Sequence, residues 1–175
     1  SAQRQLAQWV AAGLVRAEGQ ARARRYQVST LAAPAPTTPA FAVRETVADL
    51  LAGSGQNESL SGGAGNDLIL GGLRGDTLTG GAGNDIFVFG NNFGSDFVNG
   101  FDANPTDGQD LIDLSAFGIA ADQFAGRVSI QGIGTTITQV SVSDGVDANG
   151  NAMTGGQITL VGVRSTTVTV EDFLL

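Results

Sequence analysis

The sequence predicts a mainly β fold, in which a parallel roll of short strands is closed by a β-rich C-terminal cap and preceded by a short helix and a hairpin. Three observations predict it. A nine-residue period runs through residues 53–88. Glycine accounts for 26 of the 175 residues, which is about twice its usual share and suits a turn-rich fold. Strand-like segments separated by turn signals fill residues 126–175.

The period consists of four rows of nine residues that start at Gly53. The rows read GSGQNESLS, GGAGNDLIL, GGLRGDTLT and GGAGNDIFV. The sixth column always holds a carboxylate and the eighth an apolar side chain: Glu58 with Leu60, Asp67 with Ile69, Asp76 with Leu78, and Asp85 with Phe87. Side chains alternate across a strand, so the eighth-column residue points inward. Two rows therefore form one coil, and coils stack as parallel strands about 4.8 Å apart.

Stacking brings the carboxylates of neighbouring coils together, with loop 53–58 over loop 71–76 and loop 62–67 over loop 80–85. The carboxylates repel one another and glycine is costly to order, so a cation between the loops must offset both effects. Glycines also bring backbone carbonyls toward the same centre. Ca²⁺ accepts about six to eight oxygen ligands at about 2.3–2.6 Å, whereas Mg²⁺ requires a tighter octahedron. The predicted calcium ligands in the repeats are Glu58, Gly62, Gly63, Gly65, Asp67, Gly71, Gly72, Asp76, Gly80, Gly81, Gly83 and Asp85.

The four rows are not equivalent. The first has Glu58 in place of aspartate, and the third has Arg74 at its fourth position. We therefore expect loops 62–67 and 80–85, which carry two full motifs, to form the stronger calcium site. A flexible glycine-rich linker is the alternative, but it predicts no fixed register of carboxylate and apolar residue. One apolar residue per row cannot offset the entropy of ordering, so we expect the repeats to be disordered without calcium.

The rows resemble the RTX, or repeats-in-toxin, family, whose GGxGxDxUx nonapeptide binds calcium. The family comprises bacterial proteins exported by type I secretion systems. The next segment, GSDFVNGFDANPTDGQDLIDLSAFG, resembles the one that follows the repeats in secreted RTX proteins and continues the roll. This resemblance implies Asp96, Asp102 and Asp110 as further calcium ligands, with Asp107 as another candidate. The alternative for each is a solvated turn carboxylate.

The C-terminal residues VEDFLL resemble the uncleaved signature of type I secretion substrates, an acidic residue followed by a few hydrophobic ones. The resemblance implies a secretion signal at residues 171–175, the type I apparatus as a partner during export, and a secreted or cell-surface bacterial protein. The alternative is a last strand with apolar core residues, and both hold if the signal acts before folding. The stretch DGVDANGNAMTGG is interpreted as a turn, because its glycine comes too early for an EF-hand and the closing glutamate is missing.

The head of the chain carries a different pattern. Apolar residues recur at helical spacing, at Leu6, Trp9 and Val10. Two short strands are predicted around Glu18-Gly19-Gln20. Residues 5–28 thus resemble the last helix and wing of a winged-helix domain, without its earlier helices. We interpret residues 1–30 as the remnant of an upstream domain.

Composition changes mark the remaining boundaries. Residues 31–41 are rich in proline, alanine and threonine and predict a semi-rigid linker. Residues 42–52 predict a short helix that caps the first turn of the roll. Residues 53–100 are expected to form the roll, and residues 101–175 the β-rich cap with the secretion signal.

Charge is divided unevenly along the chain. Residues 1–44 carry six arginines and one acid, whereas residues 45–175 carry three arginines and sixteen acids. Nucleic acid is not an expected partner of so acidic a body, because its phosphates are negatively charged. The alternative is a nucleic-acid contact through three arginines of the head, Arg22, Arg24 and Arg25.

The missing residue types exclude several kinds of site. Histidine, cysteine and lysine are all absent, which excludes a Ser-His-Asp triad, a Cys-His pair and a P-loop. No apolar run reaches the roughly 18 residues of a membrane-spanning segment. The sequence therefore predicts no catalytic residues and no cofactor other than Ca²⁺.

Together these patterns predict a calcium-binding module that folds on calcium outside the cell and carries the C-terminal secretion signal of a larger exported protein. One alternative is the carrier end of a secreted protease, lipase or epimerase whose catalytic domain lies upstream. Another is a surface-layer or adhesive protein anchored through calcium.

Overall fold

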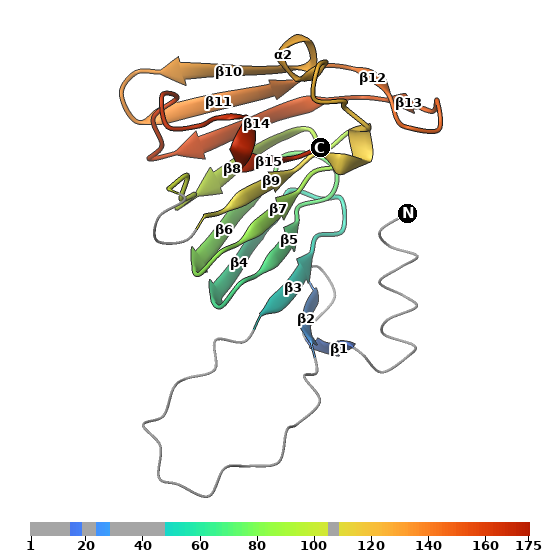
Figure 1. Cartoon of the computed structure of the whole chain (residues 1–175). Coiled ribbons are helices and arrows are strands. Elements are labelled where there is room, and N and C mark those ends of the chain that lie inside the picture. Colours follow the sequence, from blue (N-terminus) through green and yellow to red (C-terminus); the bar gives the residue numbers. More distant parts are fainter. Residues whose placement is uncertain (1–14, 19–23, 29–47, 105–108) are drawn as a thin grey trace, which may run out of the picture.

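The computed structural model describes residues 15–18, 24–28, 48–104 and 109–175, and this part of the chain is mainly β (Figure 1). Sheet A contains, in spatial order, β1 (Val15–Glu18), β2 (Arg24–Val28), β3 (Asp49–Ala52), β5 (Leu68–Leu70), β7 (Ile86–Val88), β9 (Leu111–Asp113) and β15 (Phe173–Leu174). Sheet B contains β10 (Val128–Ile133), β11 (Ile137–Val142), β14 (Gly156–Val161), β8 (Ser95–Asn99), β6 (Thr77–Ala82) and β4 (Ser59–Ala64).

Smaller elements complete the described part of the chain. They are the hairpin of β12 (Gly145–Val146) and β13 (Ala152–Met153), the 3-10 helices η1 (Ser115–Phe117) and η2 (Val170–Asp172), and helix α2 (Phe124–Arg127). Within the described residues, no helix has the length and apolar character needed to cross a membrane.

The repeats form parallel coils of two rows each. β4 pairs with β6 and places Leu60 beside Leu78, while β5 pairs with β7 and places Ile69 beside Phe87. Equivalent residues of successive coils are 18 positions apart, so alternate rows contribute to sheet B and to sheet A. This pairing confirms both the predicted parallel β-roll and the predicted stacking of its loops.

The roll continues beyond the regular period. β8 pairs with β6 and β9 pairs with β7, so Val98 follows Leu78 and Ile112 follows Phe87 along the interior. The separation of stacked positions grows from 18 to 20 residues on one side and to 25 on the other. The additional residues lengthen the loops and leave the strand register intact.

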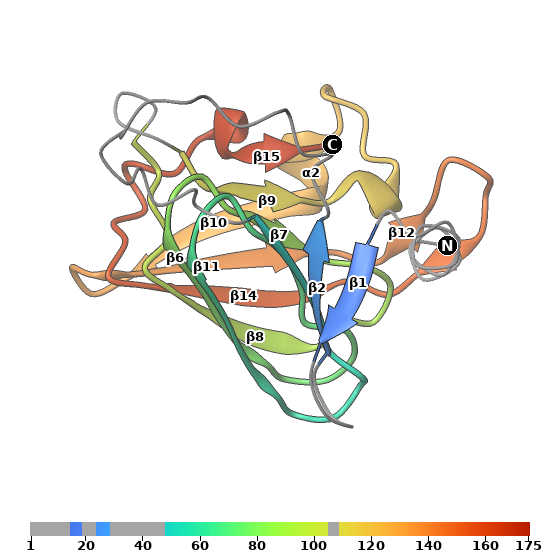
Figure 2. The same ribbon diagram turned by 90° about the horizontal axis from the view of Figure 1, so that it is seen from below.

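One inward side chain per row makes the core of the roll. The eighth-column residues Ile69, Leu78 and Phe87 are fully buried between the sheets, as predicted, and Val98 and Ile112 continue the stack. Figure 2 looks along the stack and shows the two sheets on either side of this interior. Aromatic rings fill the end nearest the cap, where Phe93 lies 5.0 Å from Phe89 and 6.1 Å from Phe117 between ring centroids.

The C-terminal cap extends both sheets of the roll. β14 adds to β8 in parallel, and β11 and β10 follow antiparallel. β15 adds to β9 in parallel and places Phe173 beside Ile112. Phe173 is buried, and its ring centroid lies 5.1 Å from that of Phe124. The residues of the predicted signal therefore include a strand that belongs to the folded core.

The start of the roll differs from the prediction. Residues 49–52 form strand β3, so the predicted capping helix over 42–52 is wrong at these positions, and residues 42–47 lie outside the described part. The reason is that Asp49-Leu50-Leu51-Ala52 repeats columns six to nine of a row. Pairing of Leu51 with Ile69 in the parallel sheet outweighs any local helix preference. The first coil thus begins at Asp49 and not at Gly53.

The predicted hairpin is present and joins the roll. β1 and β2 pair antiparallel, and β2 pairs antiparallel with β3, which adds both strands to the edge of sheet A. The predicted helix at the start of the chain and the linker over 31–41 lie outside the described residues. The division of the head and body into separate domains stays a prediction.

Replacing Phe87 with alanine should lower the free energy of unfolding of the calcium-loaded protein by about 3–5 kcal/mol, because a fully buried ring is lost from a narrow core. Phe97→Ala is the matched control. Phe97 is 51% exposed on the outer face of sheet B, and its loss should change the stability by no more than about 0.5 kcal/mol. Urea titrations in calcium measure both, and equal losses would contradict the assignment of the core.

Candidate metal centre

The sixth-column carboxylates of sheet A form a ladder along one side of the roll. The backbone N–H of Asp49 donates to Oδ1 of Asp67 at 2.7 Å, the N–H of Asp67 to Oδ1 of Asp85 at 2.8 Å, and the N–H of Asp85 to Oδ1 of Asp110 at 2.8 Å. All four side chains are buried. The carboxylates of Asp67, Asp85 and Asp110 are therefore each held against the coil before, at the place where a strand of sheet A begins.

A second ladder runs along the opposite side, where the strands of sheet B begin. The N–H of Glu58 donates to Oδ1 of Asp76 at 2.8 Å, and the N–H of Asp76 donates to Oδ1 of Asp96 at 2.7 Å. The next strand places Ile158 beside Asp96, so an apolar residue ends this ladder. The two ladders realise the predicted pairing of loops two rows apart.

The second oxygen of these carboxylates is the unusual feature. Oδ2 of Asp76, of Asp85 and of Asp96 is buried and accepts no hydrogen bond from the described residues. A buried charged oxygen without a partner costs several kcal/mol, which folded proteins rarely tolerate. These oxygens therefore indicate a ligand that supplies positive charge.

Glycine is required where the oxygens face the loops. A Cβ at Gly80 would collide with Oδ2 of Asp85, and one at Gly62 would lie 2.6 Å from the carbonyl oxygen of Gly80. A Cβ at Gly71 would lie 2.8 Å from Oδ2 of Asp76. Each turn thus packs carboxylate and carbonyl oxygens against a bare Cα.

Carbonyl oxygens of the second and fourth columns lie against the glycines at the same columns of the next coil. A Cβ at Gly81 would collide with the carbonyl oxygen of Gly63, and a Cβ at Gly83 with that of Gly65. Gly81 and Gly83 have φ of 120° and 127°, in the region that favours glycine. The predicted ligand Gly72 also has a positive φ, of 104°.

The donor set fits a hard cation. Among the described residues, no three or more His, Cys, Asp or Glu side chains gather into a metal cluster. The oxygens instead come from carboxylates of successive coils and from backbone carbonyls, which are the ligands that Ca²⁺ prefers. The chain contains no histidine or cysteine, the residues that select zinc and other softer metals.

Burial shifts the titration of the ladder carboxylates. It raises the pKa of Asp85 to about 6; the hydrogen bond from Asp67 opposes the shift, and the charges of Asp110 and Asp67 add to it. Burial raises the pKa of Asp96 to about 7; the backbone hydrogen bond from Asp76 opposes this shift, and the negative charge of Asp76 adds to it. Without a cation, these groups thus keep protons well above the usual range of an aspartate.

Glu58 is held differently from the aspartates. Its longer side chain reaches back across its own turn and accepts hydrogen bonds from the backbone N–H and, at 2.7 Å, from the hydroxyl of Ser54. Both oxygens of Glu58 thus have partners within the loop. The ranking of loop 53–58 as the weaker calcium site stays a prediction.

The predicted ligands beyond the repeats have different outcomes. Asp96 takes its place in the second ladder. Asp110 takes its place in the first, but both its oxygens accept hydrogen bonds, Oδ1 from Asp85 and Oδ2 from the N–H of Asp102 at 2.9 Å. The Asp102 side chain is exposed and accepts from the N–H of Asn104 at 2.9 Å. Asp102 thus serves the ladder through its backbone, and Asp107 lies outside the described residues.

Asp49 is the ladder member that sequence reasoning missed. It is 5% exposed and its N–H donates to Asp67. No glycine pair precedes it, so a search for the full row passes over it. The shorter pattern of a carboxylate followed two residues later by an inward apolar residue, here Asp49 and Leu51, would have found it.

The predicted turn is present at residues 147–151, where it connects β12 with β13. Oδ1 of Asp147 accepts hydrogen bonds from the N–H groups of Asn149 and Asn151, both at 2.8 Å. Hydrogen bonds from the Asn151 side chain and backbone hold the pKa of Asp147 below its usual value.

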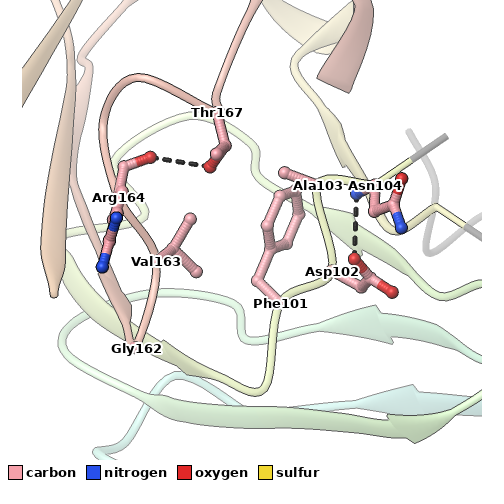
Figure 3. Close-up of a pocket in the computed structure, with 8 residues that line it drawn as sticks. All are labelled: Phe101, Asp102, Ala103, Asn104, Gly162, Val163, Arg164 and Thr167. Carbon is pink, nitrogen blue, oxygen red and sulfur yellow. Dashed lines mark hydrogen bonds between the residues drawn. The ribbon is translucent and has the colours of Figure 1, made fainter.

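A surface hollow of about 550 Å³ lies beside the cap. Figure 3 shows Arg164 and Asp102 on opposite sides of it, with Phe101 between them. The hydroxyl of Thr167 donates to the carbonyl oxygen of Arg164 at 2.8 Å. Its polar groups thus stabilise the loops that line the hollow.

Known proteins share this architecture. The family model of the RTX calcium-binding nonapeptide repeat matches residues 48–73 and 61–95. The AlgE6R3 subunit of the Azotobacter vinelandii mannuronan C5-epimerase is similar over 81% of this chain and 86% of that chain, at 25% identity and a TM-score of 0.53. No curated protein matches the chain.

Two further solved structures are similar at lower TM-scores. The AlgE6R2 subunit of the same Azotobacter vinelandii enzyme matches over 68% of this chain and 76% of that chain, with 29% identity and a TM-score of 0.48. The extracellular lipase LipA from Serratia marcescens matches over 93% of this chain and 31% of that chain, with 13% identity and a TM-score of 0.43.

Fold and site together define a calcium-binding β-roll. Residues 48–95 are RTX calcium-binding nonapeptide repeats, and such repeats bind Ca²⁺. The predicted family and the predicted cofactor are thus confirmed. The match begins at residue 48 and includes Asp49, which agrees with the extra strand β3.

Acid should favour the calcium-free roll. The pKa values of Asp85 and Asp96 rise on folding from 3.8 to about 6 and about 7. The folded state thus binds protons more tightly at these two groups, so their contribution to stability is fully present below about pH 4 and is lost as the pH rises through 6 to 7. Circular dichroism in calcium-free buffer should show more β structure at pH 5 than at pH 8; the reverse order would contradict the burial of these groups.

The two ladders should differ in strength. Asp85→Ala removes a buried carboxylate with an unpartnered oxygen, whereas Glu58→Ala removes one that is hydrogen-bonded within its loop. The first substitution should weaken calcium-induced folding more than the second. Calorimetric titration of both variants with calcium decides the ranking, and equal losses would overturn it.

Proposed function

We propose that this chain is a calcium-dependent folding and export module of a larger secreted bacterial protein. The observation that carries the proposal is the set of buried, unpartnered Oδ2 atoms of Asp76, Asp85 and Asp96 at the turns of the roll. Such oxygens oppose folding unless a cation neutralises them. Folding of the roll is thereby tied to the calcium concentration around it.

The ladders indicate which groups would hold the ions. One site uses the carboxylates of Asp67 and Asp85 with carbonyls of loops 62–67 and 80–85, and the other uses Asp76 and Asp96 with carbonyls of the facing turns. The glycines concerned are those of the predicted set, Gly62, Gly63, Gly65, Gly71, Gly72, Gly80, Gly81 and Gly83. Calcium would supply the positive charge, and the chain supplies preorganised oxygens.

The calcium dependence suits export. Extracellular modules bind Ca²⁺ with Kd of about 10⁻⁴–10⁻³ M, so sites of this class stay empty in the cytosol and fill outside the cell. Without calcium, folding would bury carboxylates that are charged and hydrated in the unfolded chain, and one apolar side chain per row is too little to offset the ordering entropy. The chain therefore remains unfolded while it passes through a secretion channel.

The proposed signal at residues 171–175 lies within the folded cap. Asp172 is buried and accepts hydrogen bonds from Nε2 of Gln109 and from the N–H of Thr169, both at 2.7 Å. Phe173 is packed in the core. A transporter could read these residues only before the fold forms, which agrees with export of an unfolded chain.

A second function is the carrier end of a secreted enzyme. The likeness to a subunit of a mannuronan C5-epimerase favours it, because that module belongs to an enzyme. In this case catalysis would lie upstream, and the roll would serve folding and export as before. A calcium-anchored adhesive protein remains the other interpretation of the same module.

Calcium should switch the fold. At neutral pH, circular dichroism of the whole chain should show little β structure in chelator and a cooperative gain when millimolar Ca²⁺ is added. Mg²⁺ at the same concentration should not replace it, because the loops offer an oxygen cage without octahedral rigidity. An unchanged β signal in chelator would contradict the switch.

Deletion of residues 172–175 should block export from cells that also express a type I transporter. The control is Phe124→Ala, which removes the ring packed on Phe173 and leaves the C-terminal sequence intact. This variant should reach the medium like the parent if the signal is read before folding. Undiminished export of the truncated chain would contradict the assignment of the signal. If neither variant is exported, the C-terminal residues act only as a folding element.

A further inference from the structure

The outward positions of the sheet B strands carry no charged side chain, although residues 45–175 contain sixteen acids and three arginines. Figure 1 shows these strands side by side from β10 in the cap to β4 at the start of the roll. Their registers align the outward residues in three rows: Ser59, Thr77, Phe97, Thr159, Gln139 and Gln131; Ser61, Thr79, Asn99, Val161, Ile137 and Ile133; and Ser95, Gln157, Ser141 and Ser129. This outer face of sheet B is therefore an uncharged surface on a strongly acidic body.

The geometry of the roll does not require this composition. Sheet A is built from the alternate rows of the same repeat, and its corresponding outward positions hold aliphatic residues such as Leu68, Ile86 and Leu111. Coil stacking and the sixth-column carboxylates are common to both sheets. The hydroxyl and amide groups on sheet B are thus a property of these particular strands.

Phe97 interrupts the hydroxyl row of the repeats. The seventh column holds Ser59 and Thr77 in the preceding coils, and Phe97 takes the same position on β8. Its side chain is 51% exposed, whereas the other aromatic rings with a described burial are buried or half-buried. Thr77 and Thr159 stand on either side of it in the neighbouring strands. The ring thus lies open to solvent between two hydroxyl-bearing side chains.

An apolar strip leads from Phe97 across the cap. Val161 pairs with Asn99 and so lies diagonal to Phe97. Ile137 and Ile133 follow it on β11 and β10. Val161 is 38% exposed and Ile133 is 47% exposed. From β8 to β10 the strip crosses three inter-strand spacings, or about 14 Å.

Neutral polar groups run beside this strip. Thr159, Gln139 and Gln131 form the adjacent row on β14, β11 and β10. Gln157 and Asn99 lie close to Phe97 in the neighbouring rows. Hydroxyl and amide side chains can both donate and accept hydrogen bonds. The surface thus combines an extended apolar strip with donors and acceptors that carry no charge.

We propose that the outer face of sheet B binds a neutral polysaccharide, with one sugar ring stacked on Phe97 and the sugar chain following the apolar strip toward β10. A sugar ring has an apolar face of C–H groups and an edge of hydroxyls. The C–H face fits the negative face of the aromatic ring and the aliphatic strip. The hydroxyl edge fits the row of Thr159, Gln139 and Gln131. This binding is an additional property of the folded roll and does not depend on export.

Charge favours a neutral polymer over other extended ligands. Nucleic acids and acidic polysaccharides are negatively charged along their length, so the acidic body repels them. Arg127 precedes β10 at a corner of the face, but its guanidinium packs on Gly145 and donates to the carbonyl oxygen of Ser143 at 3.3 Å. The face therefore offers such polymers no cation in its rows, whereas a neutral polymer meets no repulsion there.

Native gel electrophoresis of the calcium-loaded chain in gels that contain a soluble polysaccharide tests the proposal. The neutral probes are hydroxyethylcellulose, galactomannan and dextran, which differ in sugar and linkage. At least one of them should retard the protein relative to a gel without polymer. Carboxymethylcellulose is the matched acidic probe, and it should retard the protein less than the neutral polymer does.

Phe97→Thr should weaken binding of the retarding polymer about tenfold, because the stacked ring is lost. Threonine suits a strand, and circular dichroism in calcium checks that the roll is kept. If this variant does not fold, Phe97→Leu, which keeps an apolar side chain without the ring, replaces it with the same expectation. Phe97→Tyr should retain binding. The matched control is Val146→Thr, which changes a side chain that is 53% exposed on β12, outside sheet B, and should leave the retardation unchanged.

The proposal is overturned if none of the three neutral polymers retards the folded protein. It is also overturned if the folded variant without the ring is retarded like the parent, or if carboxymethylcellulose retards the parent as strongly as any neutral polymer. A mobility in polymer-free gels that depends on protein concentration and on Phe97 would make a second copy of the chain the occupant of the face, and so would overturn the proposal as well.

Discussion

The structure depends on one arrangement, a carboxylate held between two coils. Oδ1 accepts the backbone N–H of the coil before it and so fixes the register of stacking. Oδ2 is left buried and charged, which disfavours the same stacking until a cation arrives. The hydrogen bond specifies the geometry and the cation decides whether the geometry is stable. The arrangement recurs at Asp76, Asp85 and Asp96, on both sides of the roll.

The rest of the repeat follows from that arrangement. Glycines stand where a Cβ would collide with an oxygen, as at Gly80 beside Asp85. Only one side chain per row remains for the core, so burial alone supplies little stability to each coil. The thin core and the crowded oxygens together make the fold conditional on calcium. The cap is less conditional, because antiparallel strands and the packed rings of Phe124 and Phe173 stabilise it.

The sequence predicted the coil and its loop pairing, since carboxylate and apolar residue keep a fixed spacing. Asp96 and Asp110 were candidate ligands through the family resemblance, and their places in the ladders come from the structure. The sequence failed at Asp49, where the same short pattern lacks its glycines and a helix seemed equally consistent with Leu50 and Leu51. The hydrogen bond from Asp102 to Asp110 could not be predicted, because it depends on how a lengthened loop folds back. The seventh and ninth columns hold apolar residues such as Leu68 and Leu70 in one row and polar residues such as Thr77 and Thr79 in the next. This becomes a difference between the outer faces of the two sheets only when alternate rows are assigned to different sheets.

The central claim is that the Asp85 carboxylate opposes folding without calcium and supports folding with it. Asp85→Asn tests this most directly, because the amide keeps Oδ1 as an acceptor and removes the buried charge. At pH 8 in chelator the account predicts that the variant is more stable to urea than the parent. In millimolar Ca²⁺ it predicts the opposite order. A variant that is equally or less stable than the parent in chelator, or that keeps the parent's stability in calcium, would contradict the account.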